Sequence, residues 1–138
     1  MHFSEDIPIL EDWECFSLLA RKGQAAYMDC ETAIQYGHTG PRITNASQLQ
    51  RVTSHLVVLS RVYGADNGFM AQHGQAYQEI VDELRYKRIH ALLRNHDIVT
   101  ARKEIQSMEK CSWRYRVAVF LPVPLLDIFL DISSLLAG

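Results

Sequence analysis

The chain has 138 residues, of which 48% are hydrophobic and 22% are charged, and its formal net charge is −2. This composition excludes a disordered chain, because enough apolar surface is present to offset the entropy of ordering. The near-neutral charge also argues against a dedicated nucleic-acid-binding domain, which is usually basic overall. Three cysteines without a C-x-x-C spacing are typical of reduced thiols in a cytoplasmic protein, and the acidic amino terminus does not resemble a secretory signal. We therefore expect one cytoplasmic domain that spans residues 1–138.

The first predicted helix is marked by apolar residues that recur in alternating steps of four and three. This is the spacing of one side of a helix that packs against partners. The stripe consists of Ile9, Trp13, Phe16, Ala20, Gly23, Tyr27, Cys30 and Ile34. Gly37 is a stop signal after it. Gly23 either breaks the helix or lets a neighbour approach closely, and we expect one long helix.

Two further helices are predicted after the loop GHTGPRITN. The first begins near Ala46 and ends at Gly64, with apolar residues again three and four positions apart. After a short ADNG turn, a long helix is predicted from about Gly68 to Arg94. The apolar face of this helix changes side toward its end, so we expect the helix to bend or to turn a different side inward.

The fourth main helix is predicted to begin after Asn95 or Asp97, either of which can cap it. It continues until Pro122 forbids helical hydrogen bonding. Pro122 and Pro124 then form an extended elbow that releases a short amphipathic helix over about residues 125–136. The sequence therefore predicts an all-α, up-and-down bundle of four main helices with a short C-terminal amphipathic helix after a Pro-x-Pro elbow.

The C-terminal segment is the most apolar part of the chain. A membrane-spanning helix needs about 20 apolar residues, whereas the charge-free run 117–126 is short and is followed by Asp127 and Asp131. We therefore expect no membrane span. On a helical wheel one side is apolar, and we predict that it binds protein; its residues are Leu125, Ile128, Phe129, Ile132, Leu135 and Leu136. The side either packs over its own bundle or contacts a second copy or another protein.

Motifs of known metal chemistry are not found in the sequence. No glutamate is followed by a histidine three residues later, as helical di-iron sites require, and we expect no metal site and no cofactor. The carboxylate pairs Glu11/Glu14 and Glu79/Asp82 have the spacings used by magnesium-dependent all-α nucleotide pyrophosphatases. They lie too far apart in the sequence to match that family, so solvated helix faces explain them more simply.

The segment RYKRIH, from Arg85 to His90, resembles the R-x(4–6)-H motif of HEPN ribonucleases, which are all-α proteins. The resemblance implies an arginine that holds the scissile phosphate and a histidine that acts as general acid or base. Ten arginines and six histidines produce about one such match by chance, and Tyr86 stands where the family usually has a small polar residue. Side chains five positions apart on a helix diverge by about 140°, so convergence needs a second chain. Whether the protein is an enzyme stays open, and we favour a non-enzymatic function.

Charge is unevenly distributed along the chain. Residues 1–31 contain seven acids and two bases, whereas residues 85–116 contain nine bases and three acids. The bases that could form a nucleic-acid surface are Arg85, Lys87, Arg88, Arg94, Arg102 and Lys103. The simpler interpretation is that the acidic first helix lies beside these bases and pairs with them.

The predicted function is a non-enzymatic protein–protein interaction module of the adaptor, inhibitor or modulator type. We expect a small regulatory protein that forms a homodimer or binds another protein. The alternative is an HEPN-like ribonuclease or a nucleic-acid-binding helical protein that uses the basic residues 85–116.

Overall fold

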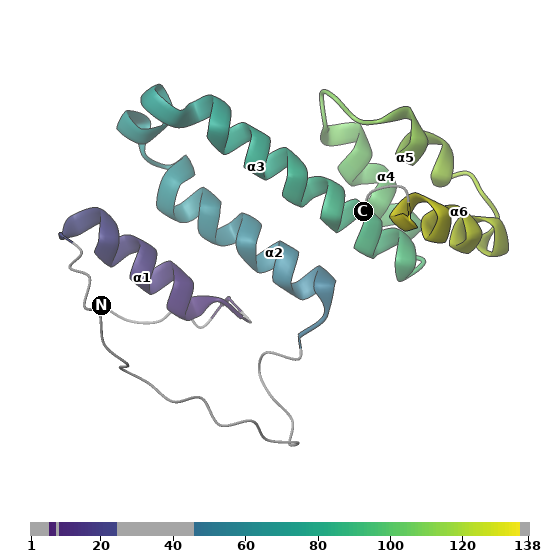
Figure 1. The fold of residues 1–138 in the computed structure, drawn as a ribbon, viewed down its shortest axis with the longest axis horizontal. Helices are drawn as coiled ribbons and strands as arrows, with labels where there is room; N and C mark the ends of the chain where they lie inside the picture. Colours follow the sequence, from purple (N-terminus) through teal and green to yellow (C-terminus); the bar gives the residue numbers. More distant parts are fainter. Residues whose placement is uncertain (1–5, 8, 25–45, 136–138) are drawn as a thin grey trace, which may run out of the picture. The chain divides into compact units, whose positions relative to one another are not determined.

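The computed structural model describes residues 6–7, 9–24 and 46–135, apart from the side chains of residues 11 and 133–135. Every regular element in these ranges is a helix, so the predicted all-α class is confirmed (Figure 1). Within the same ranges, no helix is long and apolar enough to cross a membrane. The chain divides into two compact units, an amino-terminal unit of residues Met1–Gly74 and a carboxyl-terminal unit of residues Gln75–Gly138.

The amino-terminal unit contains α1 (Glu11–Lys22) and α2 (Gln48–Leu59), and α2 continues into the π-helical segment η2 (Ser60–Gly64). The start of α2 is determined locally by a capping box. The amide of Gln50 donates to the Ser47 hydroxyl at 3.2 Å, and the amide of Ser47 donates to the Gln50 side chain at 2.9 Å. The second predicted helix is therefore confirmed, with a widened last turn.

The prediction of one long first helix is wrong at Gly23. Helix α1 ends at Lys22, because Gly23 adopts an extended conformation with φ −130° and ψ 175°. Its amide still donates to the Leu19 carbonyl at 3.0 Å and so closes the last helical turn. The remaining residues of the predicted stripe, Tyr27, Cys30 and Ile34, lie outside the described residues.

The inward side of α1 also differs from the prediction. Glu14 and Ser17 are buried, whereas Phe16, which was expected in the core, is 64% exposed. Leu19, on the same side as Phe16, is exposed as well. Of the predicted stripe, Ile9 is buried and Trp13 packs against His55. Phe16, however, turns to solvent, and Glu14 and Ser17 face inward instead.

Ion pairs explain why the polar side of α1 faces inward. Arg61 of η2 pairs with Asp6 and lies 3.5 Å from Glu14, and Arg21 of α1 pairs with Asp66. The hydrogen bond from Arg61 holds the pKa of the Asp6 carboxyl below its usual value. A small apolar cluster supplements these pairs; it contains Ile7, Val58 and Val62, with Leu18, Val57 and Tyr63 packed against it.

The third helix, α3 (Asn67–Arg94), matches the predicted range closely. Its first turn is capped by Asp66, whose side chain accepts a hydrogen bond from the Phe69 amide at 2.9 Å. The predicted change of inward side along α3 is not seen, because the earlier part of the helix buries no side and Ile80 there is 49% exposed. The buried residues lie near the carboxyl end; they are Ile89, Ala91, Leu92 and Leu93.

The predicted fourth helix is two helices, α4 (Ile98–Ser107) and α5 (Trp113–Ala118). Asp97 caps α4 as expected, because its carboxylate accepts from the Thr100 amide at 3.1 Å. Hydrogen bonds from the Thr100 side chain and then from its amide lower the pKa of Asp97. The break follows from a contact with α3. The Tyr86 hydroxyl donates to the Lys110 carbonyl at 2.9 Å and accepts from the Ser112 amide at 3.1 Å, which holds this segment as a loop.

The carboxyl-terminal unit is completed by α6 (Val123–Leu135). Its core is aliphatic and draws on every helix of the unit. The buried residues outside α3 are Ala101, Ile105, Met108, Ala118, Val119, Leu126 and Leu130.

Candidate interaction surface

Helix α6 starts two residues earlier than predicted. The Pro122 carbonyl accepts from the amides of Leu125 at 3.0 Å and Leu126 at 2.9 Å, so Pro122 caps the helix. Pro124 lies in the first turn, where its missing N–H would have no helical partner. The predicted extended elbow is therefore shorter than expected, because the second proline is part of the helix.

One side of α6 attaches the helix to its own unit. Leu126 and Leu130, one turn apart, are fully buried. At one edge of this side, Asp131 pairs with Arg94 at 2.6 Å and Asp127 lies 3.2 Å from the His96 Nε2. These contacts orient α6 on the end of α3 and on the turn that follows it.

The opposite side of α6 is apolar and uncovered. Leu125, Ile128 and Ile132 are each more than half exposed, and at 100° per residue they lie within one narrow sector opposite Leu126 and Leu130. We call these three residues the α6 ridge. Of the other residues predicted to bind protein, Phe129 is half-buried, whereas the Leu135 side chain and Leu136 lie outside the described part of the chain.

Most of the predicted basic surface is neutralised within the carboxyl-terminal unit. Glu104 of α4 lies 2.8 Å from Arg85 and 3.1 Å from Arg88, and the side chains of all three are mostly shielded from solvent. Lys87 pairs with Glu83 at 2.6 Å, and Arg94 is engaged by α6. Arg85, Lys87, Arg88 and Arg94 therefore stabilise the fold and offer little free charge to a nucleic acid.

The two residues of the ribonuclease-like motif are in different environments. Arg85 is held by Glu104 and also donates to the Ser107 hydroxyl. His90 is half-buried, and this burial together with the nearby Arg94 lowers its pKa. Since Arg85 and His90 are five residues apart on one helix, a single chain does not bring them to one phosphate.

Helix α5 presents a second apolar side to solvent, which we had not predicted as a site. Its inward residues are Tyr115, Ala118 and Val119, of which the last two are fully or nearly fully buried. Diametrically opposite lie Trp113, which is 69% exposed, Val117, and Phe120, which is 75% exposed. We call these three residues the α5 ridge. The sequence contained this signal, because at 100° per residue the three ridge residues fall on the side opposite Tyr115 and Val119.

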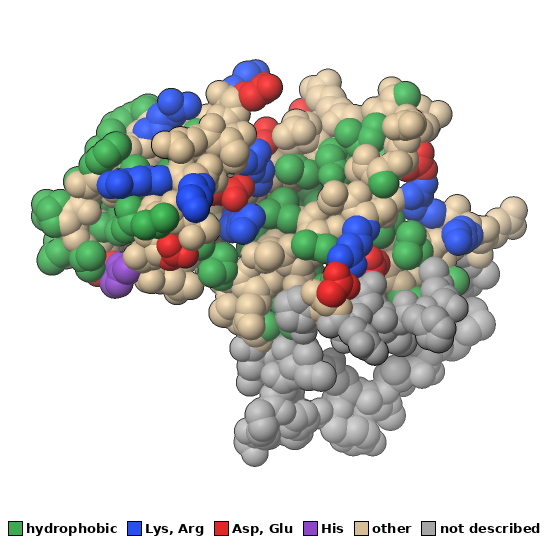
Figure 2. Space-filling model, turned by 180° about the vertical axis from the view of Figure 1, so that it is seen from behind, with side chains coloured by type: hydrophobic (Ala, Val, Ile, Leu, Met, Phe, Trp, Pro, Cys, Tyr) green, Lys and Arg blue, Asp and Glu red, His purple; other side chains and the backbone are tan. Residues whose placement is uncertain are grey.

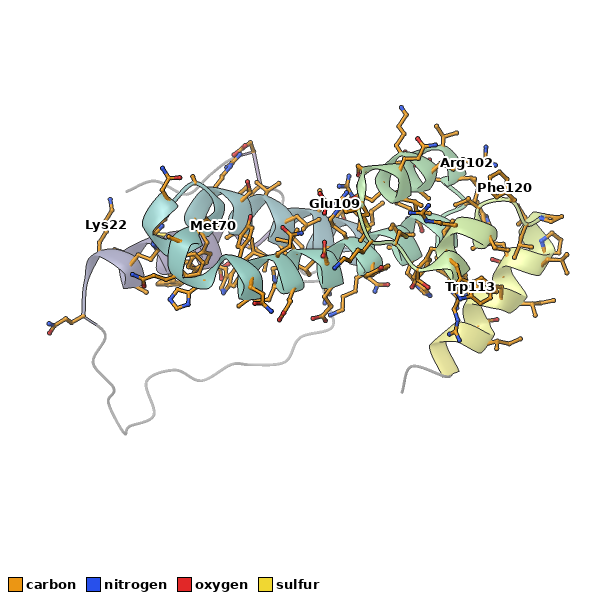
Figure 3. All side chains as sticks on the ribbon, turned by 90° about the horizontal axis from the view of Figure 1, so that it is seen from above. Lys22, Met70, Arg102, Glu109, Trp113 and Phe120 are labelled. Carbon is orange, nitrogen blue, oxygen red and sulfur yellow. The ribbon has the colours of Figure 1, made fainter. Side chains whose placement is uncertain are left out.

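Basic side chains surround the α5 ridge. Arg114 and Arg116 are exposed at the two edges of α5. Arg102 of α4 donates to the Val119 carbonyl at 2.9 Å, and its guanidinium lies 4.9 Å from the centre of the Phe120 ring. Figure 3 shows Arg102 and Phe120 near one end of α5 and Trp113 near the other. In Figure 2, Lys and Arg side chains lie among hydrophobic ones on the carboxyl-terminal unit, at the left.

Groups with shifted pKa near α5 stay neutral at physiological pH. Burial raises the pKa of the Cys111 thiol and of the Tyr115 hydroxyl, so neither is activated as a nucleophile or a base. Among the residues that the structure describes, no group of three or more His, Cys, Asp or Glu side chains could hold a metal ion.

A hollow in the amino-terminal unit, beside the start of α3, is lined in part by Arg21, Arg61 and Asp66. The two arginines are already paired there, Arg21 with Asp66 and Arg61 with Asp6. This neutralisation leaves the hollow without free charge to attract an anion.

Comparison of the chain with protein families, with curated proteins and with solved structures finds no match.

Proposed function

We propose that this chain is a non-enzymatic protein–protein interaction module of the adaptor, inhibitor or modulator type, and that it forms a homodimer through the α6 ridge. The observation that carries the proposal is that α6 is attached by one side and leaves a continuous apolar side uncovered. Leu126 and Leu130 already fill the core, whereas more than half of each of Leu125, Ile128 and Ile132 stays exposed to solvent. An apolar side of this kind is typical of a protein contact.

The charge of the α6 ridge favours a second copy of the same chain. The ridge residues carry no charge, and the two acids of α6, Asp127 and Asp131, are engaged with His96 and Arg94. In a two-fold symmetric contact the same surface meets itself, so a neutral surface avoids repulsion between like charges. The α6 ridge can therefore face its own copy without charges of opposite sign on the other surface.

The expected affinity is modest. Full burial of an aliphatic side chain contributes about 1.5–3 kcal/mol, and roughly half of this remains for each ridge residue. Six such side chains across a symmetric contact contribute on the order of 4.5–9 kcal/mol. Association costs an estimated 4–15 kcal/mol, so the ridge residues alone leave at most about 5 kcal/mol. We therefore expect a dimer that forms at about 0.2 mM or higher concentration and is strengthened by neighbours such as Phe129.

Light scattering over a range of protein concentrations tests the proposal. We expect the intact chain to approach twice the monomer mass, and Ile128→Asp to remain monomeric because a carboxylate would be buried in the contact. Val99→Asp is the matched control, since Val99 is equally exposed on α4 of the same unit. A chain that is monomeric throughout, or an Ile128→Asp variant with undiminished mass, would contradict the homodimer.

The up-and-down arrangement of the four main helices as one bundle stays a prediction, and so does the cytoplasmic location. Distances between spin labels placed on exposed positions of α1 and α4, such as Lys22 and Lys103, would test the bundle.

A further inference from the structure

We propose that the α5 ridge docks on an anionic membrane surface, with Trp113, Val117 and Phe120 in the headgroup layer and Arg114 and Arg116 on lipid phosphates. The helix would lie in the plane of the membrane without crossing it. The proposal goes beyond the dimer and concerns different residues.

The short helix α5 and the turn after it, which carries Phe120, have the residue pattern of an interfacial segment. Its inward side is anchored by Ala118 and Val119, so the ridge on the other side is free of the core. Amphipathic helices that lie on membranes place Trp, Phe and aliphatic residues on one side and basic residues at its edges. A tryptophan is favoured at such an interface because its ring is apolar and its indole N–H can still reach water or a headgroup.

The electrostatics around α5 favour an anionic occupant. Three bases lie in or beside this surface, namely Arg102, Arg114 and Arg116, and two more in the same stretch of sequence, Lys103 and Lys110, are exposed. Of the two acids in the same stretch, Glu104 is engaged by Arg85 and Arg88, which leaves Glu109. Among the residues that the structure describes, neither Arg114 nor Arg116 has an ion-pair partner. These bases would also repel a second copy of the same surface, so the α5 ridge does not suit a symmetric dimer.

A lipid surface fits the ridge better than a single-stranded nucleic acid does. Nucleic-acid platforms stack successive bases on the flat faces of aromatic rings. Here the Arg102 guanidinium already covers one face of the Phe120 ring, and the central ridge residue is the aliphatic Val117. The outward side of a single helix is also convex, so it can penetrate a soft interface without a matching groove.

The test uses the full chain with vesicles of phosphatidylcholine, either pure or mixed with phosphatidylserine. The chain has two tryptophans, so Trp13→Phe leaves Trp113 as the only indole reporter. We expect the emission of Trp113 to shift to the blue on mixed vesicles at low salt. We also expect the chain to sediment with them, and added salt to weaken the binding by screening.

Paired variants assign the binding to the ridge and to its bases. Each base near an anionic surface strengthens binding about fivefold, so Arg114→Gln with Arg116→Gln should weaken sedimentation about 25-fold. Trp113→Ser with Phe120→Ser should abolish it within the measurable range. The controls are Lys87→Gln and Ile80→Ser, an exposed base and a half-exposed apolar residue on α3, and both should bind as the parent does.

Three results would overturn the proposal. The first is an unchanged Trp113 emission, with no sedimentation, on mixed vesicles at low salt. The second is undiminished sedimentation of the Trp113→Ser, Phe120→Ser variant, with circular dichroism confirming its fold. The third is quenching of Trp113 by a polyuridine oligonucleotide but not by vesicles, which would assign the ridge to nucleic acid. The monomeric Ile128→Asp variant keeps the α5 ridge, so failure of the dimer and failure of membrane docking are distinguishable.

Discussion

Helices α1 and α6 have similar apolar periodicity but use it in opposite ways. In α6 the buried residues are Leu126 and Leu130, and the second apolar side is left over as a ridge. In α1 the buried residues are Glu14 and Ser17, and Phe16 stays in solvent. A wide apolar sector thus shows that a segment is helical, but it does not identify the side that faces the core.

The difference follows from what each helix meets. Helix α1 meets Arg61 of η2 and donates from Arg21 to the Val62 carbonyl, so polar groups on its inward side find partners. Helix α6 packs in a unit whose core is aliphatic, and its acids find partners only at the edge, in Arg94 and His96. Buried polar groups are tolerated where they are paired.

The largest expected effect concerns the inward side of α6. Leu130→Ala should reduce the free energy of unfolding of the carboxyl-terminal unit by about 2–5 kcal/mol, because it leaves a cavity in the core. Ile128→Ala is a comparable truncation on the exposed side of the same helix. It should change the free energy of unfolding by less than about 0.5 kcal/mol. Native-state hydrogen exchange on dilute protein measures both. Equal losses for the two variants would mean that the α6 ridge is also part of the fold.

A smaller effect is expected for the inward side of α1. Glu14→Ala should destabilise the amino-terminal unit more than Phe16→Ala does, because Glu14 is buried and lies 3.5 Å from Arg61. Phe16→Ala should cost less than about 0.5 kcal/mol, since that side chain is mostly in solvent. Urea denaturation of both variants decides the matter, and a larger loss for Phe16→Ala would reverse our assignment of the inward side.

The caps should act regardless of which side of a helix faces inward. Ser47→Ala removes the hydroxyl that accepts from the Gln50 amide and should cost about 1 kcal/mol. Gln48→Ala, an exposed first-turn substitution that keeps the cap, is the control. The urea midpoint of each variant is the measurement. No loss in Ser47→Ala would show that the start of α2 is determined by tertiary contacts instead.

The smallest expected effect is a pH dependence at the end of α3. Burial, and then Arg94, lower the pKa of His90 in the folded chain, so the folded state favours the neutral ring. The unfolded chain takes up the proton near the ordinary pKa of 6.5. Above that pH the ring is neutral in both states, so His90 does not reduce the free energy of unfolding. As the pH falls through 6.5 toward the lower pKa of the folded state, the unfolded chain binds the proton first and the free energy of unfolding declines. His90→Gln should flatten this decline in urea titrations; an unchanged slope would exclude His90 as its source.

Local signals in the sequence predicted the all-α class, the cap at Asp97 and the extent of α3. These features follow from residues within a few positions of one another. The break between α4 and α5 could not be predicted in this way, because it depends on the Tyr86 hydroxyl, which reaches a carbonyl 24 residues away. The α6 ridge was expected as part of a wider apolar sector, whereas the α5 ridge was missed because one continuous helix was assumed.

The sequence alone was sufficient to predict the helical class, since periodicity and capping act over one or two turns. It was also sufficient to predict no membrane-spanning helix, since the charge-free run 117–126 is too short. Tertiary contacts decided which sides became core and which became free ridges. Those choices depend on pairs remote in the chain, such as Arg61 with Asp6, and on the competition between paired ions and aliphatic side chains for the same buried space.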